Sequence, residues 1–286
     1  MKELSSWERV KLAIEHKNTD RVPTNFYGVP EIHKRLVADL KKDNMEGVLQ
    51  YLGIDIREVG ARFVGPRDLA GGFDVLDVPK DIWGIVRKPV YNQFGVYTEF
   101  VHHPLAAAKS IDDVEKHAWP KVEWFDVSHL RDEIKQLNRR EKRWIKCFGG
   151  GAFETPWYLR GMDQFLVDLI ENPELAEAIS RHSIDFFMAR TRKIFEACDG
   201  QLDMILTGGD IGTQRGMMLA PDLWRKHIKP YSHELFKTYA SWGVKLIYHS
   251  CGAIRPVIPD FIEMGLDVLD PVQPLAAGMD PVSLKK

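Results

Sequence analysis

The sequence predicts an α/β protein built around a largely parallel sheet. Six short apolar runs alternate with segments of helical spacing, and most of these runs end in glycine or polar residues. Connections that contain a helix are typical of parallel strands. The polar and glycine-rich clusters fall where strands end, and that edge carries the active sites of α/β proteins.

Each element is predicted from local signals. Ser5 and Glu8 form a capping-box pattern, and proline after Asn172 and at Pro221 opens a helix. The predicted helices cover residues 5–17, 30–42, 128–140, 172–197, 221–243 and 256–264. The predicted strands fall at residues 20–28, 54–59, 144–148, 203–207, 244–248 and 266–270. Residues 73–104 interrupt the alternation, because two apolar runs flank Asn92-Gln93-Phe94-Gly95 and predict an antiparallel hairpin outside the main fold.

Two architectures fit this order, a TIM (β/α)8 barrel and a doubly wound sheet. A Gly-x-Gly-x-x-Gly motif is missing after the first strand, which weakens the dinucleotide-binding form of the second. A barrel needs eight strands, and six are predicted. Asp280-Pro281 has the pattern of a helix start close to Lys286. We therefore expect a single domain over residues 1–286, a barrel truncated after about six βα units with its C-terminal units missing.

Composition narrows the functional class. The net charge of −2 provides no electrostatic footprint for nucleic acid or an anionic membrane. Apolar stretches stay well below the ~20 residues that span a bilayer. Three cysteines, an odd number, argue against a disulfide framework and for a reducing compartment. We expect a cytoplasmic protein that acts on a small molecule.

The clearest chemical signal is His249-Ser250-Cys251-Gly252, at the end of the fifth predicted strand. A neutral imidazole and a thiolate are preferred zinc ligands, so His249 and Cys251 are candidate metal ligands. The other interpretation is a strand-end histidine bonded to a neighbour and a thiol buried in the core. Any further ligands would have to come from other strands.

Two carboxylates follow neighbouring predicted strands and are candidate catalytic residues. Asp210 is flanked by glycines that let the backbone approach a ligand, although such an aspartate also organises loops. Glu154 follows the glycines at 149–151, which lack the lysine and hydroxyl of a phosphate-binding loop. We interpret Glu154 as a ligand or proton-transfer group, or as a solvated loop acid.

Several stretches together resemble the uroporphyrinogen decarboxylase superfamily over essentially the whole chain. The matching segments are residues 8–10 through 20–23, 153–161, 210–231, 249–252 and 258–274. The resemblance implies a TIM barrel with a cleft at its C-terminal face. True decarboxylases carry an Arg-Gln-Ala-Gly-Arg motif after the first strand, where this chain has Phe26-Tyr27-Gly28-Val29-Pro30. The chain therefore resembles more closely the cobamide-dependent methyltransferases of the superfamily.

That branch moves a methyl group between a corrinoid protein and a thiol or folate-type acceptor. Its thiol-specific members bind zinc through His-x-Cys and a distant cysteine, and His249 and Cys251 match the first two ligands. The third would lie beyond Lys286, and Glu154 or Asp210 are possible substitutes. The resemblance implies zinc as the metal cofactor and a small corrinoid protein as partner. For a pterin acceptor, Asp210 would bind the ring.

Charged and polar side chains near the predicted strand ends and in the family-like segments are candidates for substrate binding. Arginine suits carboxylates by its fork geometry, although a single arginine is more often part of a structural ion pair. The candidates are Asp55, Tyr158, Arg160, Gln214 and Gln273. Two other functions stay open, uroporphyrinogen decarboxylation and a catalytically inactive module that binds a corrinoid or another partner.

Overall fold

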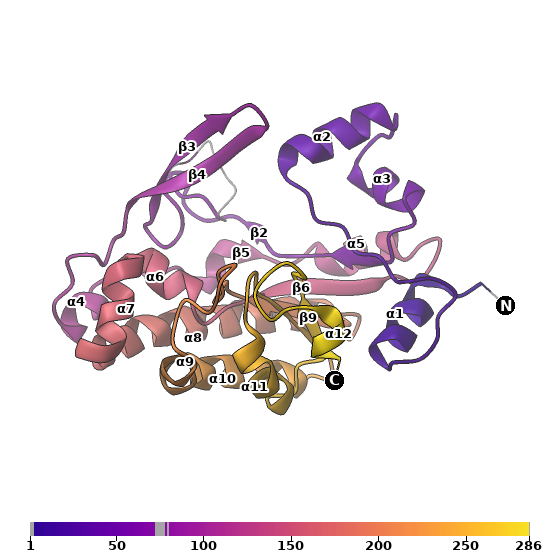
Figure 1. Ribbon diagram of the computed structural model, residues 1–286. Coiled ribbons are helices and arrows are strands. Elements are labelled where there is room, and N and C mark those ends of the chain that lie inside the picture. Colours follow the sequence, from indigo (N-terminus) through magenta and orange to yellow (C-terminus); the bar gives the residue numbers. More distant parts are fainter. Residues whose placement is uncertain (1–2, 72–77, 79, 286) are drawn as a thin grey trace.

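The computed structural model describes residues 3–71, 78 and 80–285, and its centre is a parallel sheet of five strands (Figure 1). The strand order is β1-β6-β7-β8-β9, so neighbours in the sheet are also consecutive among these strands along the chain. The strands are β1 (Ile56–Glu58), β6 (Trp144–Gly150), β7 (Met204–Gly208), β8 (Lys245–His249) and β9 (Val268–Asp270). The predicted α/β class with a parallel sheet is confirmed.

The first predicted strand, at residues 20–28, is not a strand in this structure. The segment runs extended beside β1, and Asp55 N–H donates to Thr24 O at 3.0 Å. Pro23 has no N–H to donate. The Thr24 N–H is bonded to the Asp55 side chain, at 2.8 Å from Oδ2, and is therefore not available to a neighbouring strand.

The predicted hairpin is present. β3 (Val86–Asn92) and β4 (Gly95–His102) pair antiparallel, with Asn92 opposite Gly95 at the turn. Residues 73–77 and 79 of the predicted excursion lie outside the described residues. A second small sheet pairs β2 (Arg62–Phe63) with β5 (Phe125–Asp126) antiparallel. Figure 1 shows the hairpin and α2 rising from the same side of the molecule.

Helices surround the sheet. They are α1 (Ser6–Ile14), α2 (Pro30–Asp39), α3 (Met45–Tyr51), α4 (Ile111–Glu115), α5 (Leu130–Leu137), α6 (Glu154–Arg160), α7 (Met162–Glu171), α8 (Pro173–Ala197), α9 (Pro221–His227), α10 (Lys229–Ala240), α11 (Ile258–Glu263) and α12 (Pro281–Leu284), with short 3-10 turns η1 (Val122–Trp124) and η2 (Arg255–Val257). Figure 1 shows α8 to α11 together on the side of the sheet opposite the hairpin and α2. In the part of the chain that the structure describes, no helix combines the length and apolarity needed to cross a bilayer.

Local signals explain where several helices begin and break. Ser5 and Glu8 make both bonds of the predicted capping box at the start of α1. The single helix predicted over residues 221–243 is instead two helices, α9 and α10, separated at Ile228. Pro230 is the reason, because it has no N–H for the helical bond four residues back and restricts the residue before it.

Alternation along β8 decides which way its side chains face. Tyr248 packs on the helix side of the sheet, with its ring 4.3 Å from Phe261 and 6.1 Å from Phe236. Ile247 points the other way, into a smaller cluster that includes Trp144. His249 therefore shares the face of Ile247, away from the helices.

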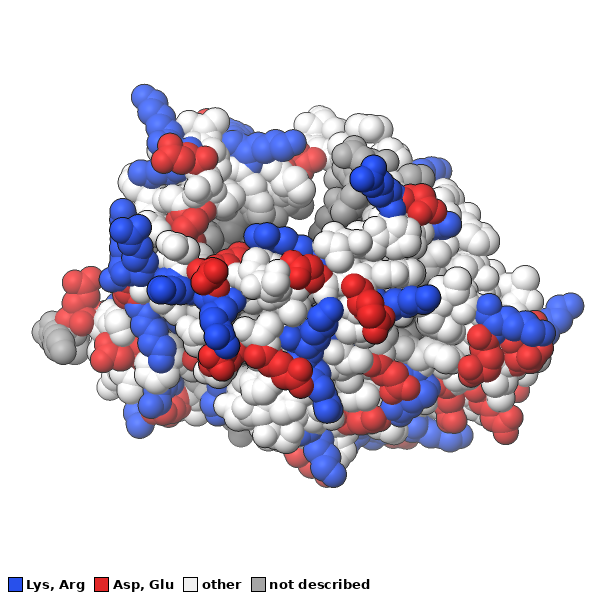
Figure 2. Space-filling model, turned by 180° about the vertical axis from the view of Figure 1, so that it is seen from behind, with Lys and Arg blue, Asp and Glu red and all other residues white. Residues whose placement is uncertain are grey.

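The rear face of the molecule carries both signs of charge. Figure 2 shows lysine and arginine side chains intermingled with aspartate and glutamate over this face. Several exposed charges of the molecule form ion pairs, such as Arg181 with Glu234 at 2.8 Å. Such exposed pairs contribute little to stability, typically about 0–1 kcal/mol.

Candidate metal centre

Asp210, His249 and Cys251 come together at the carboxyl edge of the sheet, each offering one ligand atom within 4.8 Å of the others. His249 Nε2 lies 3.6 Å from Asp210 Oδ1 and 3.7 Å from Cys251 Sγ. Zinc bonds of about 2.0–2.3 Å in a tetrahedral site place neighbouring ligand atoms about 3.3–3.5 Å apart. A nitrogen, a sulfur and a carboxylate oxygen at these separations fit a zinc ion after small adjustments.

The histidine is held by a fourth residue, Asp270. His249 Nδ1 lies 3.0 Å from Asp270 Oδ2, so this bond leaves Nε2 directed at Asp210 and Cys251. The arrangement follows from the pairing of β8 with β9, which places His249 opposite Asp270. A carboxylate on the outer nitrogen is the usual partner of a metal-binding histidine, because it selects the tautomer and raises ligand basicity.

Glycines allow the strand ends to approach so closely. A Cβ on Gly151, which follows β6, would lie 1.6 Å from Gly208 O, an impossible contact. Gly208 in turn sits opposite His249 in the sheet. Gly252 has φ of +87°, in the left-handed region, and a Cβ there would meet the backbone of Gly212 at 2.5 Å. These glycines allow close packing of the backbone at the site.

Negative charge gathers around the cluster. The hydrogen bond with Asp270 raises the pKa of His249, with burial opposing it and Asp210 adding to it. Burial raises the pKa of the Cys251 thiol, and Asp210 raises it further. The neighbouring carboxylates contribute to both shifts, and a group of carboxylates beside His249 and Cys251 favours a cation at this position.

Glu154 and Tyr158 lie next to Asp210. The Glu154 carboxylate accepts hydrogen bonds from the Asp210 backbone N–H and from the Tyr158 hydroxyl. Burial raises the pKa of Glu154, and the nearby Asp210 carboxylate raises it further. α6 begins at Glu154, so both side chains come from the same helix next to the cluster. Tyr158 also packs on Phe100, with ring centroids 4.8 Å apart, and therefore has a structural contact as well.

The two glutamines meet at the edge of the site. Gln214 Nε2 donates to Gln273 Oε1 at 3.0 Å, and Gly252 N–H donates to the same oxygen at 2.8 Å. Gly252 directly follows Cys251, so Gln273 holds the backbone next to a candidate ligand. The Gln214 side chain is exposed and faces solvent beside the cluster.

Asp55 and Arg160 have structural roles instead of the predicted substrate contacts. Asp55 precedes β1, at the opposite end of the sheet from the cluster, and pairs with Arg9 and Arg21 at 2.7 Å each. Its side chain is fully buried. Arg160 is buried at the end of α6, pairs with Asp168 at 2.6 Å and donates to three main-chain carbonyls at Leu105, Ala106 and Ala108. Neither side chain has free hydrogen-bonding capacity directed at the cluster.

Asp270 was not among the residues predicted for the site. It ends the last predicted strand, so the same strand-end signal that marked Asp210 was available for it. Its role depends on the register of β8 with β9, which pairs it with His249. Sequence spacing alone does not determine that register.

Fold and site together define an α/β protein with a cluster of candidate metal ligands at the carboxyl edge of a parallel sheet. Residues 93–279 match the sequence profile of the uroporphyrinogen decarboxylase (URO-D) family, and the chain belongs to that family. A methyltransferase from Methanosarcina mazei has a similar fold, with a TM-score of 0.58 and 17% sequence identity over 93% of this chain and 76% of that chain. A comparison with curated protein sequences finds no match.

Proposed function

We propose that this member of the URO-D family is a methyltransferase, and that Asp210, His249 and Cys251 hold a zinc ion in its active site. The observation that carries the proposal is the cluster itself, a nitrogen, a sulfur and an oxygen ligand with His249 oriented by Asp270. The structurally similar protein from Methanosarcina mazei bears the name methyltransferase, which favours this activity over decarboxylation.

The strand order supports a barrel as the architecture behind this site. Each of the five sheet strands lies beside its sequence neighbour, and the order does not reverse. A doubly wound sheet has a point where the order switches direction, whereas a barrel continues in one sense. We infer that β1 and β6 to β9 are part of a (β/α)8 barrel, with the cluster at its C-terminal face.

The proposed acceptor is a small thiol and the proposed methyl donor is a corrinoid protein. When bound, zinc would act as a Lewis acid that favours the thiolate form of the acceptor. Glu154 would accept the thiol proton, because burial and then the Asp210 carboxylate raise its pKa above the ordinary value and make it a stronger base. Asp270 keeps the imidazole of His249 in the tautomer with a free Nε2.

Metal content and methyl transfer together test this function. We expect about one zinc per chain after purification from zinc-containing medium. With methylcobalamin as donor and 2-mercaptoethanol as acceptor, loss of the methylcobalamin absorbance reports transfer. Cys251→Ser and His249→Ala should each lower both zinc content and transfer. His233→Ala is the matched control, because His233 is exposed on α10 and away from the cluster.

Other outcomes separate the alternatives. Decarboxylation of uroporphyrinogen by the protein would overturn the methyltransferase proposal. Methyl transfer to a reduced folate but not to a thiol would keep the class and replace the acceptor. Zinc binding without turnover of either substrate would point to a binding module. Transfer that is unchanged in Cys251→Ser would remove the zinc-thiolate site from the reaction.

A further inference from the structure

A second site lies apart from the cluster, in a cavity of about 710 Å³ between the segment that follows Pro23, α3, β1 and α5. This volume is within the range of small-molecule sites, about 300–1,000 Å³. None of the cluster residues Asp210, His249 and Cys251 lines it. Its apolar wall consists of Phe26, Leu49, Ile56, Val59, Phe125, Leu137, Phe148 and Ile194.

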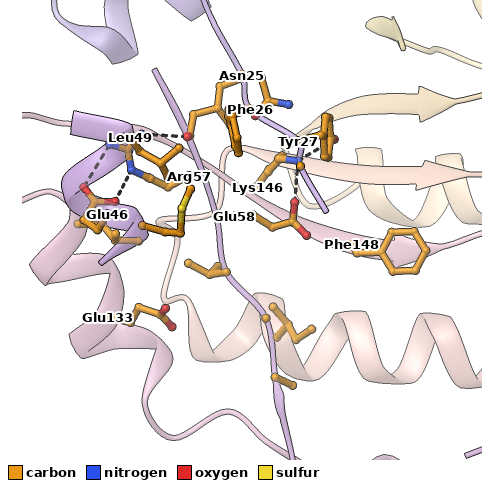
Figure 3. Close-up of a pocket in the computed structure, with 18 of the residues that line it drawn as sticks. Asn25, Phe26, Tyr27, Glu46, Leu49, Arg57, Glu58, Glu133, Lys146 and Phe148 are labelled. Atoms are coloured by element: carbon orange, nitrogen blue, oxygen red, sulfur yellow. Dashed lines mark hydrogen bonds and ion pairs between the residues drawn. The ribbon is translucent and has the colours of Figure 1, made fainter. Parts of the chain in front are cut away.

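Two of the cations that line the cavity are already neutralised. Figure 3 shows Lys146 bonded to Glu58 and Tyr27, and Arg57 bonded to Glu46 on the opposite side of the cavity. The Lys146–Glu58 distance is 2.7 Å and the Arg57–Glu46 distance is 2.6 Å. Each of these cations therefore has its own carboxylate.

Arg190, from α8, is different. Among the described residues that line the cavity, it is a cation for which no carboxylate partner is found. Its Nε is buried without any hydrogen-bond partner, and the side chain makes one hydrogen bond, to Phe148 O at 3.3 Å. The ionisable groups that act on it, Cys147 and Tyr239, have raised pKa values and are neutral at pH 7. The Arg190 side chain is half-buried. A guanidinium in this position that has no carboxylate partner among the described residues loses part of its hydration without compensation by an opposite charge.

Aromatic rings compensate part of this cost. The Arg190 guanidinium lies 5.5–5.8 Å from the ring centroids of Phe125, Phe148, Phe186 and Phe187. Rings at this distance attract a cation but leave most of its hydrogen-bond donors unused. Arg190 also lines a smaller cavity of about 240 Å³.

We propose that the larger cavity binds a small molecule that carries a carboxylate on an apolar body, and that Arg190 pairs with this carboxylate. The guanidinium fork matches a carboxylate, and the phenylalanine-lined wall takes the apolar part. Asn25 and Tyr27, at the cavity, offer polar groups to the remainder of the ligand. The site is independent of the proposed methyltransferase chemistry, because it shares no residue with the cluster.

Calorimetric titration with benzoate tests the proposal on the intact chain, with benzamide as a neutral molecule of the same shape. We expect benzoate to bind at millimolar concentration and benzamide to bind at least about tenfold more weakly, the loss typical of a charge-assisted hydrogen bond. Arg190→Gln should weaken benzoate binding by about tenfold or more. Arg190→Lys should give an intermediate affinity, because it keeps the charge and loses the fork.

Arg192→Gln is the matched control, since Arg192 is exposed on the same helix, and it should bind benzoate like the unmodified protein. If Arg190→Gln does not fold, the comparison of benzoate with benzamide and the lysine variant still decide the outcome. Equal binding of benzoate and benzamide, no binding of benzoate, or unchanged affinity in the arginine variants would overturn the proposal. Binding of inorganic phosphate without benzoate would assign the cavity to phosphate esters and also overturn it.

Discussion

Asp270 shows how one side chain can orient a candidate metal ligand without being a ligand itself. Its carboxylate takes the outer nitrogen of His249, so the imidazole can turn neither away from Cys251 nor into the other tautomer. Free rotation of His249 would otherwise have to be stopped on metal binding, at a cost in side-chain entropy. The hydrogen bond with Asp270 should therefore raise the affinity of the site for a metal ion.

Replacing Asp270 tests this directly. Asp270→Ala should lower zinc affinity by about 10–100-fold, the range typical of lost outer partners of metal-binding histidines. Competition with a zinc indicator dye measures the affinity without reference to activity. Asp222→Ala, exposed on α9, is the control and should bind zinc normally. An affinity for Asp270→Ala equal to that of the control would contradict the orienting role.

Asp20 and Asp55 make the protein sensitive to acid. The hydrogen bond from Arg9 lowers the pKa of Asp20 below its ordinary value. Burial opposes ionisation of Asp55, but hydrogen bonds from Arg21 and the Thr24 N–H outweigh it and lower its pKa. Both folded-state pKa values lie below the unfolded value near ~3.9, so the stability they provide is complete above about pH 5 and is lost as pH falls through both values.

Asp55→Asn tests how much Asp55 contributes to the loss of stability in acid. At pH 7 the variant should lose about 1.5–3 kcal/mol, because Arg9 keeps Asp20 but loses the charge of its fully buried second partner. Its free energy of unfolding should also fall less between pH 5 and pH 3 than that of the unmodified protein. Urea unfolding at several pH values measures both effects. Asp43→Asn is the exposed control, and a variant with an unchanged acid slope would show that Asp55 is not a source of the pH dependence.

At the scale of elements, the ends of β6, β7 and β8 form one packed unit. Gly151 packs against the backbone of Gly208, and Gly208 pairs with His249. The backbone at the candidate metal ligands can therefore take this position only because Gly151 and Gly208 have no side chain. Close backbone approach of this kind is one of the few roles that only glycine fills.

A methyl group added at the contact of Gly151 with Gly208 should therefore lower the free energy of unfolding. Gly151→Ala should cost at least the ~1–3 kcal/mol typical of overpacked cores, because its Cβ would meet backbone that cannot rotate aside. Gly60→Ala is the control, since a Cβ there meets nothing within 4 Å. The midpoint of urea unfolding compares the two. Equal midpoints would mean that the strand ends can separate at little cost.

Elements with strong local signals were predictable. The caps of α1, the proline start of α8 and the Asn92–Gly95 turn are coded within a few residues, and the structure contains all three. The errors occurred where distant residues decide. Residues 20–28 read as a strand by their own composition, but the Asp55 side chain takes the Thr24 N–H that a ladder needs.

For the molecule as a whole, the sequence predicted that residues following different parallel strands meet at one edge of the sheet, and this part of the candidate site could be anticipated. That rule placed Asp210 near His249 and Cys251 from sequence alone. The strand-end rule does not distinguish an acid before a strand from one after it, and Asp55, which precedes β1, lies at the other edge of the sheet and pairs with Arg9 and Arg21. Arg190 had no sequence signal, because its lack of a carboxylate partner among the described residues depends on which surfaces come together in the folded chain.

α6 connects the segment that follows the β3–β4 hairpin to the cluster of Asp210, His249 and Cys251. Arg160, at its last residue, is tied to the three carbonyls that follow the hairpin, and Leu105 N–H donates to Leu159 O at 2.9 Å. Glu154, at its first residue, receives the Asp210 N–H. The helix is seven residues long, or about 10 Å. The Glu154 carboxylate beside the candidate metal ligands is therefore positioned in part by residues 105–108, which hold the other end of α6 and do not line the cluster.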